Sequence, residues 1–311
     1  MIVYRELSSL EKDLGFSARA MYSVSYHRGR HYHRAKVPKG NGEYRELWVP
    51  DDLLKAIQRS IAEHLLAYEA ISPYAMAYRP GGGTLENARP HAGKPVLLKL
   101  DIRHFFDHII YPMVKEAAFP AERYSEPNRV LLTMLCMYRD ALPQGAPTSP
   151  AISNIIMRDF DDRVGGWCRA RGIVYTRYCD DMTFSGDFAA GDVVRFVRQE
   201  LGKMGLLLND KKTVAAHSGQ KKIVTGIVVN EKPSVPAEYR RRLRQELHFC
   251  RKFGVEEHVR RLGLDCSAEQ YTKRLLGRVN YVLQITPDHG EMEKYKSWLK
   301  GQLSEGERKG P

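Results

Sequence analysis

Apolar positions along much of the chain recur every three or four residues, the spacing at which side chains share one face of an α-helix. Between residues 192 and 205, for example, one such face is formed by Val193, Phe196, Val197, Leu201 and Met204. The same pattern predicts further helices over about 51–70, 125–138, 150–170, 236–254 and 271–285. Much of the chain is therefore expected to form amphipathic helices.

Shorter apolar and β-branched runs, each ended by turn-forming residues, predict β-strands. One run, from Val96 to Leu100, is largely apolar and is expected to be a buried strand. The runs 172–178 and 181–186 flank Cys179 and Asp180 and predict a β-hairpin, and 221–230 predicts another strand. The mixture of helices and strands indicates an α+β protein.

Glycine and proline mark where regular structure is expected to stop. Residues 79–94 contain three consecutive glycines and two prolines and are predicted to be a loop. Residues 27–48 are predicted to form a basic hairpin that turns at 39–43. The last ten residues, 302–311, are expected to fray.

Length and composition fit a folded protein with more than one core. The chain has 311 residues, of which 43% are hydrophobic and 28% charged, enough for two or three packed subdomains. Its 49 Lys and Arg against 37 Asp and Glu give a formal net charge of +12. This excess favours a polyanionic partner, either nucleic acid or an anionic membrane. Charge and length together favour nucleic acid.

Neither a membrane nor an oxidising compartment is indicated. No apolar run approaches the roughly 20 residues that span a bilayer, and the N-terminal stretch lacks the apolar core of a secretory signal. The five cysteines form no C-x-x-C pair, so we expect reduced thiols in a cytoplasmic protein. His27, His31 and His33 have no matching Cys or acid cluster and are expected in a solvated basic loop rather than at a metal.

Aspartate doublets occur three times, and their surroundings predict different roles. Asp51-Asp52 precedes a helical pattern and is expected to cap that helix. Asp161-Asp162 lies in an amphipathic helix, where the apolar spacing is expected to place both acids on the solvated face. Asp180-Asp181 is different, because apolar and β-branched residues flank it on both sides. That doublet needs another explanation.

A third acid, Asp101, follows the buried strand and is a candidate partner of Asp180 and Asp181. Three clustered carboxylates repel one another, so a bare site would be unstable or partly protonated. Divalent cations remove that repulsion, and Mg²⁺ prefers carboxylates together with substrate phosphates. Two such ions about 4 Å apart can activate an attacking hydroxyl and stabilise a leaving pyrophosphate. The acids alone do not distinguish a polymerase from a nuclease.

Four motifs follow one another along the chain: KLDIRHFF, LPQGAPTSPAISN, YCDD and GLLLNDKKT. In this order and spacing they resemble the palm and fingers of reverse transcriptases over roughly residues 30–285. The resemblance implies an α+β right-hand polymerase fold, with an antiparallel palm sheet packed on helices and a small helical thumb. It implies an N-terminal segment and fingers at 1–93, a palm at 94–230 with part of the fingers at about 112–140, and a thumb and tail at 231–311.

The resemblance implies roles for residues at the matching positions. Asp101, Asp180 and Asp181 match the catalytic carboxylates that bind two Mg²⁺ ions. Ile102 would add a backbone carbonyl to the ion held with the nucleotide. Phe106 matches an aromatic steric gate that excludes a 2′-OH, whereas its residue type alone would favour a core aromatic.

Further matches are implied for the incoming deoxynucleotide. Gln144 and Gly145 match part of the nucleotide pocket, where a side chain in place of the glycine would collide with the substrate. Lys212 matches a lysine that acts on the pyrophosphate, and the sequence does not firmly choose between it and the adjacent Lys211. Arg45, on the fingers hairpin, is a candidate triphosphate clamp or else a surface arginine.

Two short stretches narrow the resemblance to retron reverse transcriptases. NARPH, from Asn87 to His91, matches their N-A-x-x-H signature, and VTG, comprising Val224, Thr225 and Gly226, matches their second signature. Without the resemblance these residues would be a turn, a satisfied loop histidine and a strand bend. Cys179 replaces the alanine common in the Y-x-D-D motif of retron enzymes, and we expect little loss of activity from it.

Retron enzymes recognise a cognate structured non-coding RNA and prime from the 2′-OH of an internal guanosine in it. Their product is a branched RNA–DNA hybrid, multicopy single-stranded DNA, and they act in antiphage defence, usually with an effector protein. The resemblance thus implies dNTPs, the partner RNA and its product as ligands. The chain shows no second acid cluster suited to a ribonuclease H domain, so template removal would need a host ribonuclease H. The basic helices after residue 236 resemble the thumb and are expected to bind nucleic acid mainly through phosphate.

Other classes of protein remain open at this point. A group II intron or diversity-generating reverse transcriptase would share the polymerase motifs, but the former would carry a C-terminal maturase and endonuclease extension. A catalytically inactive RNA-binding protein with a polymerase fold would not need the three intact aspartates. A two-metal nuclease would need neither LPQG nor a steric gate.

Overall fold

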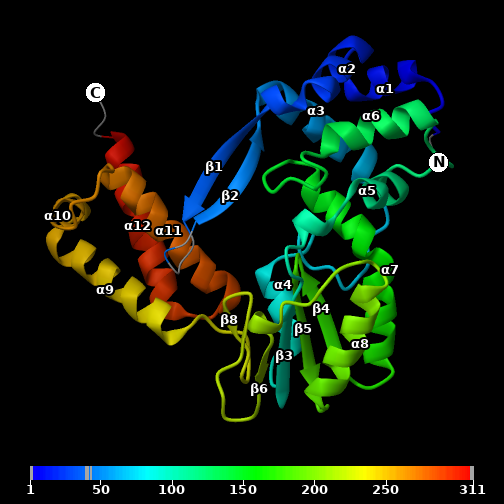
Figure 1. The fold of residues 1–311 in the computed structure, drawn as a ribbon. Helices are drawn as coiled ribbons and strands as arrows, with labels where there is room; N and C mark the ends of the chain where they lie inside the picture. The colour runs from blue at the N-terminus through cyan, green and yellow to red at the C-terminus, as the bar shows by residue number, and fades with distance from the viewer. Residues whose placement is uncertain (1–2, 39–41, 43, 309–311) are drawn as a thin grey trace. The chain divides into compact units, whose positions relative to one another are not determined.

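The computed structural model describes residues 3–38, 42 and 44–308 of the chain (Figure 1). Helices and antiparallel sheets are both present, which confirms the α+β class. The chain forms two compact units. Unit 1 combines Met1–Gly83 with Pro95–His217, and unit 2 combines Thr84–Lys94 with Ser218–Pro311.

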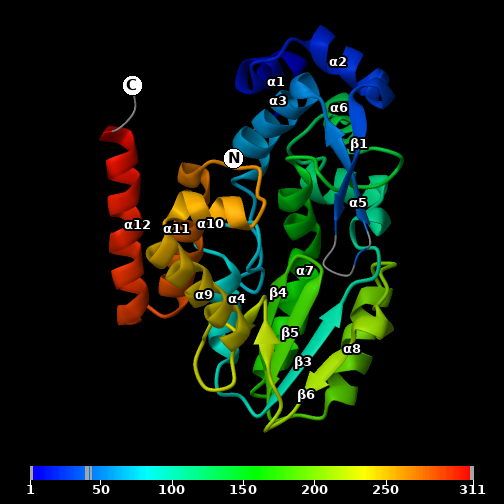
Figure 2. The ribbon, with the colours of Figure 1, turned by 90° about the vertical axis from the view of Figure 1, so that its left-hand side faces the viewer.

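An antiparallel sheet is the centre of unit 1 (Figure 2). Its strands lie in the order β4 (Val174–Tyr178), β5 (Asp181–Gly186), β3 (Val96–Asp101) and β6 (Val214–Ala216). β4 and β5 form the predicted hairpin, because Tyr178 pairs with Asp181 and leaves Cys179 and Asp180 as its turn. β3 is the predicted buried strand, and it pairs with both β5 and β6.

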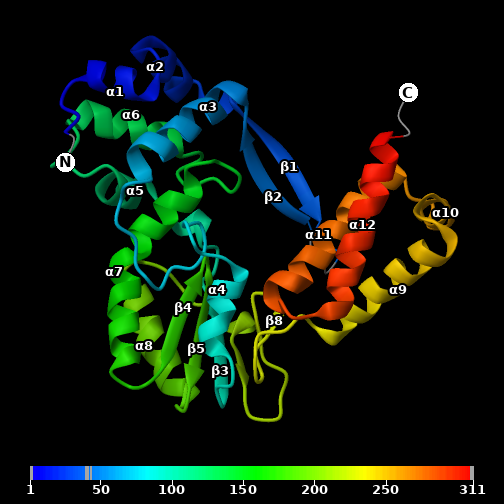
Figure 3. The same ribbon diagram turned by 180° about the vertical axis from the view of Figure 1, so that it is seen from behind.

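The long helices α7 (Ser149–Arg169) and α8 (Ala190–Gly202) cover the same face of this sheet. Figure 1 and Figure 3 show this from two opposite directions. Phe160 of α7 and Phe184 of β5 are both fully buried in the core. Of the apolar face predicted for residues 192–205, Val193, Val197 and Leu201 are buried in α8, whereas Phe196 and Met204 are half-buried. Period-3.6 patterning was therefore sufficient to predict the helices that support the sheet.

The rest of unit 1 consists of helices and a long hairpin. Strands β1 (Tyr32–Pro38) and β2 (Tyr44–Pro50) pair along their whole length, and the predicted turn lies outside the described residues except for Gly42. The helical elements are α1 (Leu7–Leu14), α2 (Ala18–Tyr26), η1 (Arg28–Arg30), α3 (Asp52–Ile61), the π-helical turn η2 (Ala62–Leu66), η4 (Phe106–His108), α5 (Tyr111–Ala118), α6 (Glu126–Cys136) and η5 (Asp210–Lys212). Helix α3 begins as predicted, because Asp51 accepts a hydrogen bond from Leu54 N at 2.9 Å.

Unit 2 is built from helices and a small hairpin (Figure 3). Its elements are α4 (Thr84–Ala88), η3 (Arg89–His91), β7 (Ile223–Val224), β8 (Ile227–Val228), α9 (Ala237–Phe253), α10 (Val255–Arg261), α11 (Ala268–Ile285) and α12 (Gly290–Arg308). As predicted, Leu243, Leu247 and Cys250 form the buried stripe of α9. Helices α11 and α12 pack side by side, and Ser267 caps α11 through a capping box.

The prediction of a loop over 79–94 is wrong in part. Leu85 and Ala88 are buried three residues apart in the short helix α4, which packs against β7 and β8 despite the glycines before it. The compact units are bounded at 83/84, 94/95 and 217/218, which differs from the limits expected at 93/94 and 230/231. The assignment of fingers, palm and thumb to residue ranges stays a prediction.

Two further secondary-structure predictions are also wrong. Residues 221–230 do not form one strand, because the backbone reverses at Thr225 and Gly226, which have φ angles of 45° and 83°. The expected fraying over 302–311 is absent as far as Arg308 in the described part of the chain, since α12 continues to that residue. The first error comes from judging a strand by its own composition, although strand formation depends on the neighbours that pair and pack with it.

Candidate active site

The acidic residues singled out in the sequence meet at one end of the unit 1 sheet. Asp101 ends β3 and is the register partner of Asp181, the first residue of β5. Asp180 occupies the adjacent turn, and its carbonyl accepts a hydrogen bond from Ile102 N at 3.1 Å. Strand pairing therefore brings Asp101 beside the doublet, although the sequence separates them widely.

Asp101 is 4% exposed, and both of its carboxylate oxygens have partners. One oxygen accepts a hydrogen bond from Asn209 Nδ2 at 2.9 Å, and the other forms an ion pair with Lys212 Nζ at 2.7 Å. The hydrogen bond to Asp101 is the main reason why the pKa of Lys212 is raised. Both adjacent lysines line the neighbouring cavity, but only Lys212 makes this contact.

Asp181 experiences the repulsion that the sequence predicts. Burial raises the pKa of Asp181, and the negative charges of Asp180 and Asp101 raise it further, while Lys99 opposes the shift. The ionised form of this carboxyl group is therefore disfavoured by its surroundings. A cation bound among these acids would remove the repulsion.

The donor set fits a hard divalent cation in its chemistry. Mg²⁺ prefers oxygen ligands, and Asp101, Asp180, Asp181 and the Ile102 carbonyl can supply them. In the described part of the chain, no three His, Cys, Asp or Glu side chains are already grouped as a metal site. Asp101 is bound to Lys212 instead. A cation that binds this carboxylate would compete with the Lys212 ammonium group for its negative charge.

Buried side chains stabilise the turn that carries Asp180 and Asp181. Cys179 has a φ of 61°, a left-handed conformation that is uncommon for residues other than glycine. Its carbonyl accepts a hydrogen bond from Arg177 Nη1 at 2.9 Å. Arg177 also forms an ion pair with Asp161 of α7, in which Nη2 and Oδ2 are 2.6 Å apart and both side chains are fully buried. This pair ties the hairpin to the helix behind it.

The prediction that Asp161 lies on the solvated face of its helix is wrong. Asp161 is 0% exposed, and Tyr175 also donates a hydrogen bond to it at 2.7 Å. It follows buried Met157 by four residues and precedes buried Val164 by three, so it shares their face of α7. Arg177 is the sequence feature that could have predicted the burial of Asp161, because a charged residue inside a buried strand requires a partner of opposite charge.

A cavity of 1360 Å³ opens beside the three acids, and residues of unit 1 line it. Its wall includes the residues to which the resemblance gives nucleotide contacts, namely Arg45, Ile102, Phe106, Gln144 and Lys212. Phe106 is half-buried, and its ring centroid lies 5.3 Å from that of Phe105. The structure thus gathers these residues around one space, and their individual roles stay predictions.

Gly145 lies against the β1–β2 hairpin. A side chain at this position would place Cβ 3.0 Å from the Trp48 carbonyl oxygen, and a φ of 119° is strained for any other residue. Trp48 N also donates a hydrogen bond to the Gln144 carbonyl at 2.9 Å. The close approach of two backbone segments therefore requires this glycine, independently of the predicted contact with substrate.

The two signature stretches lie together in unit 2. Thr225 Oγ1 donates a hydrogen bond to the Thr84 carbonyl at 2.8 Å, which joins the VTG turn to the start of α4. Asn87 and His91 are 1% and 0% exposed. Burial lowers the pKa of His91 to about 3, with a smaller contribution from Lys94. Among the described residues, the buried Asn87 Oδ1 has no hydrogen-bond partner.

The histidines near the N-terminus lie outside this cavity. His31 Nδ1 is 2.7 Å from a carboxylate oxygen of Asp51, the residue that also caps α3. His27 and His33 are exposed. His31 therefore contacts the residue that caps α3, and its ion pair does not involve the other two histidines.

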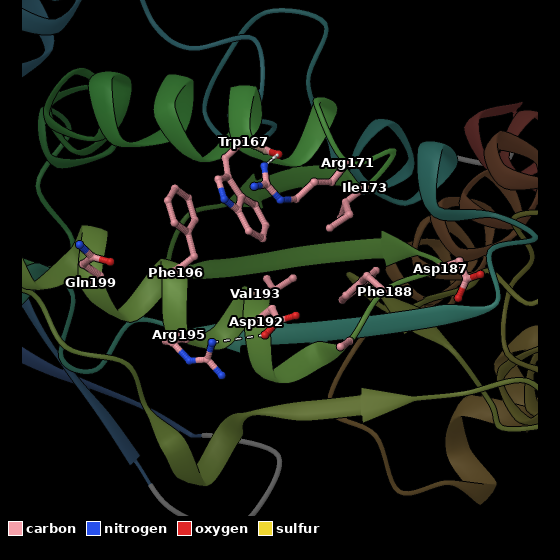
Figure 4. Close-up of a pocket in the computed structure, with 11 residues that line it drawn as sticks. Trp167, Arg171, Ile173, Asp187, Phe188, Asp192, Val193, Arg195, Phe196 and Gln199 are labelled. Atoms are coloured by element: carbon pink, nitrogen blue, oxygen red, sulfur yellow. Dashed lines mark hydrogen bonds and ion pairs between the residues drawn. The ribbon is translucent and has the colours of Figure 1, made fainter.

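A second cavity, of 510 Å³, lies between the end of α7 and the start of α8 (Figure 4). Trp167 and Phe196 stack there with ring centroids 4.4 Å apart, and the Arg171 guanidinium lies 4.2 Å from the centroid of Trp167. Asp192 and Arg195 form an exposed ion pair at its edge. The lining contains none of the predicted site residues, so the candidate active site is the larger cavity.

Known proteins resemble this chain over most of its length. The family described as "Reverse transcriptase (RNA-dependent DNA polymerase)" matches residues 37–264. The retron Mx65 reverse transcriptase of Myxococcus xanthus is 33% identical in an alignment 318 residues long, gaps included, and the alignment covers 93% of this chain and 70% of that protein. The retron Ec86 reverse transcriptase of Escherichia coli is 30% identical over 298 residues, which cover 93% and 92% of the two chains.

These matches confirm the family that the ordered motifs and the NARPH and VTG stretches indicated. They also favour the retron interpretation over a group II intron or diversity-generating enzyme. Among the residues that the structure describes, every helix is too short or too polar to span a bilayer. The chain belongs to the retron reverse transcriptases, and it has the right-hand polymerase fold and is an RNA-directed DNA polymerase.

Proposed function

We propose that this enzyme copies part of a cognate structured non-coding RNA into branched multicopy single-stranded DNA, primed from a 2′-OH of that RNA. The observation that supports the proposal most directly is the pairing of Asp101 with Asp181, beside Asp180, at the edge of a large cavity. The substrates are dNTPs and the partner RNA, and the product is an RNA–DNA hybrid.

In this proposal Asp101, Asp180 and Asp181 hold two Mg²⁺ ions, with the Ile102 carbonyl as a further ligand. Bound ions of this kind neutralise charge at the attacking hydroxyl and the leaving pyrophosphate. Lys212 has a raised pKa and keeps its positive charge. From its position beside Asp101, the Lys212 ammonium would neutralise negative charge on the pyrophosphate.

The remaining cavity residues select and orient the nucleotide. The Arg45 guanidinium binds the triphosphate in a forked geometry. The Phe106 ring excludes a ribonucleotide 2′-OH. Gln144 and Gly145 contact the incoming nucleotide where the LPQG loop meets the fingers hairpin.

The NARPH and VTG stretches serve recognition of the partner RNA. Because Asn87 and His91 are buried, they act by fixing the shape of α4 and the VTG turn rather than by touching the RNA. Helix α9, on which Arg241, Arg244 and Arg251 are exposed, binds phosphates of duplex and structured RNA.

The cellular part of the proposal rests on the kinship with retron enzymes. The protein acts in the cytoplasm, takes part in antiphage defence with an effector protein, and relies on a host ribonuclease H to remove template RNA. Nucleic acid that co-purifies with the enzyme from its source cells should contain DNA joined 2′ to 5′ to RNA. Only linear DNA in that fraction would contradict the branched product.

The proposed metal site is tested with Asp180→Asn combined with Asp181→Asn. We expect this double variant to lose incorporation of dNTPs on a primed RNA template. Without Mg²⁺ at neutral pH it should melt at a higher temperature than the wild type, because the raised pKa of Asp181 means that its ionised form destabilises the fold above that pKa. Mg²⁺ should raise the melting temperature of the wild type but not that of the double variant.

The matched control for this experiment is Asp187→Asn, because Asp187 is an exposed acid that lines the second cavity. It should keep both the activity and the Mg²⁺-dependent rise in melting temperature. If the double variant copies RNA at the wild-type rate, the assignment of the three aspartates is wrong.

A further inference from the structure

Arg139 is a cation of the active-site cavity to which the motifs give no role. Its side chain is exposed and lines the cavity. Within the described part of the chain, its guanidinium contacts aromatic rings and forms no ion pair. Lys212, by contrast, is already bound to Asp101. Arg139 therefore keeps its hydrogen-bond donors available for a ligand.

Arg139 sits in a turn whose conformation disfavours its residue type. Tyr138 and Ala141 exchange two backbone hydrogen bonds, of 3.0 Å and 3.2 Å, around Arg139 and Asp140. The two central residues have φ angles of 52° and 60°. Such a turn favours Asn-Gly or a similar pair, so Arg-Asp is a strained choice. Strain that is retained at the wall of an active-site cavity points to a use for the side chain.

Aromatic rings hold the Arg139 guanidinium in place. Its Cζ lies 4.3 Å from the ring centroid of Trp48 and 5.4 Å from that of Tyr138. Those two rings are themselves in contact, with centroids 5.1 Å apart. A guanidinium that stacks on a ring keeps its N–H groups at the edge of its plane, where they match the geometry of a phosphate. The arrangement is therefore suited to a nucleic acid strand.

The position of Trp48 distinguishes this guanidinium from that of Arg45. Trp48 and Arg45 are three residues apart on β2, and side chains alternate between the two faces of a strand. Arg139 thus stacks on the face opposite to Arg45, although both line the same cavity. Because Arg45 is the proposed ligand of the triphosphate, Arg139 faces a different phosphate. The strand that pairs with the incoming nucleotide supplies one.

We propose that Arg139, stacked on Trp48, binds a backbone phosphate of unpaired template RNA as the template enters the cavity. This inference rests on the proposed function, since a template enters this cavity only if polymerisation takes place there. Grooves for single strands combine cations for phosphates with aromatic rings for bases. Arg139, Trp48 and Tyr138 bring both types of group together at one place.

The test is Arg139→Gln, with binding measured for primer–template duplexes whose template strand extends beyond the primer by increasing lengths. We expect roughly fivefold weaker binding when the unpaired extension is present, and little change for a blunt duplex. The slope of log affinity against log salt should fall in magnitude by about 0.7, the loss of one single-strand phosphate contact. The KM for dNTPs should stay at the wild-type value.

Arg139→Lys separates charge from stacking. It should retain the salt dependence of the wild type and lose part of the affinity, because an ammonium binds phosphate without the planar stack on Trp48. The matched control is Arg171→Gln, since Arg171 stacks on Trp167 at 4.2 Å in the second cavity (Figure 4). This control should leave affinity, salt dependence and KM unchanged.

An equal loss of affinity for blunt and extended duplexes, or an unchanged salt dependence, would overturn the assignment of Arg139. A higher KM for dNTPs with unchanged template binding would move Arg139 to the triphosphate and also contradict it. A failure of the proposed function can be told apart from a failure of the Arg139 assignment. If the proposed active site is wrong, the variant with Asp180→Asn and Asp181→Asn still copies RNA, whatever the Arg139 variants do.

Discussion

Loss of the carboxylate charge at Asp161 should destabilise unit 1 far more than loss of an exposed ion pair. Arg177 and Asp161 are both 0% exposed. Arg177 Nε donates to both carboxylate oxygens of Asp161, at 2.8 Å and 3.0 Å, and Nη2 donates to one of them at 2.6 Å. Asp161→Asn keeps the shape of the side chain and removes its charge, which leaves the Arg177 cation buried without compensation.

The magnitude follows from that burial. Breaking a buried ion pair by removing one partner costs about 3–5 kcal/mol, because the remaining charge stays in a medium of low dielectric constant. Asparagine still accepts one hydrogen bond, so we expect about 3 kcal/mol of lost unfolding free energy. Arg177→Met combined with Asp161→Leu should recover much of this stability, because no charge then remains buried. The variant with Arg177→Met and Asp161→Leu should still lose activity, since the Cys179 carbonyl loses its hydrogen-bond donor.

The assay is urea denaturation monitored by circular dichroism, and the rate of dNTP incorporation is measured as well. Arg195→Met is the control, because Arg195 pairs with Asp192 at 3.4 Å on the surface of the same unit and the side chains are 81% and 62% exposed. Its effect should not exceed about 1 kcal/mol. Equal shifts of the unfolding midpoint for Asp161→Asn and Arg195→Met would refute the reasoning.

Two further outcomes are expected. Phe106→Ala should admit ribonucleotides, because the ring that excludes a 2′-OH is removed; unchanged discrimination between dNTPs and rNTPs in single-nucleotide addition would remove Phe106 from the gate. Stability should fall as the pH drops below 6.5 toward the lowered pKa of His91, about 3, because the unfolded chain binds a proton that the buried side chain excludes. The loss is about 1.4 kcal/mol per pH unit in that window. Urea midpoints at pH 7 and 5 measure it, and a His91→Asn variant with the wild-type pH dependence would count against this origin.

Local pattern was enough to predict the elements that carry the acids. The buried strand before Asp101 and the hairpin around Cys179 and Asp180 have signals within a few residues, namely apolar runs ended by turn residues. The meeting of Asp101 with Asp181 depends on the register of strands that are distant in sequence, which no local pattern determines. The resemblance of four ordered motifs supplied that connection.

Other features required tertiary information. Asp161 is polar and was expected at the surface, but its environment is set by Arg177, which comes from another element. The helix α4 inside a glycine-rich segment forms against the VTG turn, and the residues involved are far apart along the chain. Arg139 has no motif at all, and its conformation and its stack on Trp48 became visible only in the structure.

The chain passes from unit 1 into unit 2 for residues 84–94 and then returns. This short passage contains the buried His91 and receives the bond from Thr225. During synthesis, the segment therefore leaves the ribosome long before residues 218–228, which complete its packing, have been made. For the same reason, a fragment that stops at His217 would expose apolar groups of α4, and a chimaera that exchanges unit 2 between relatives would have to exchange both pieces together.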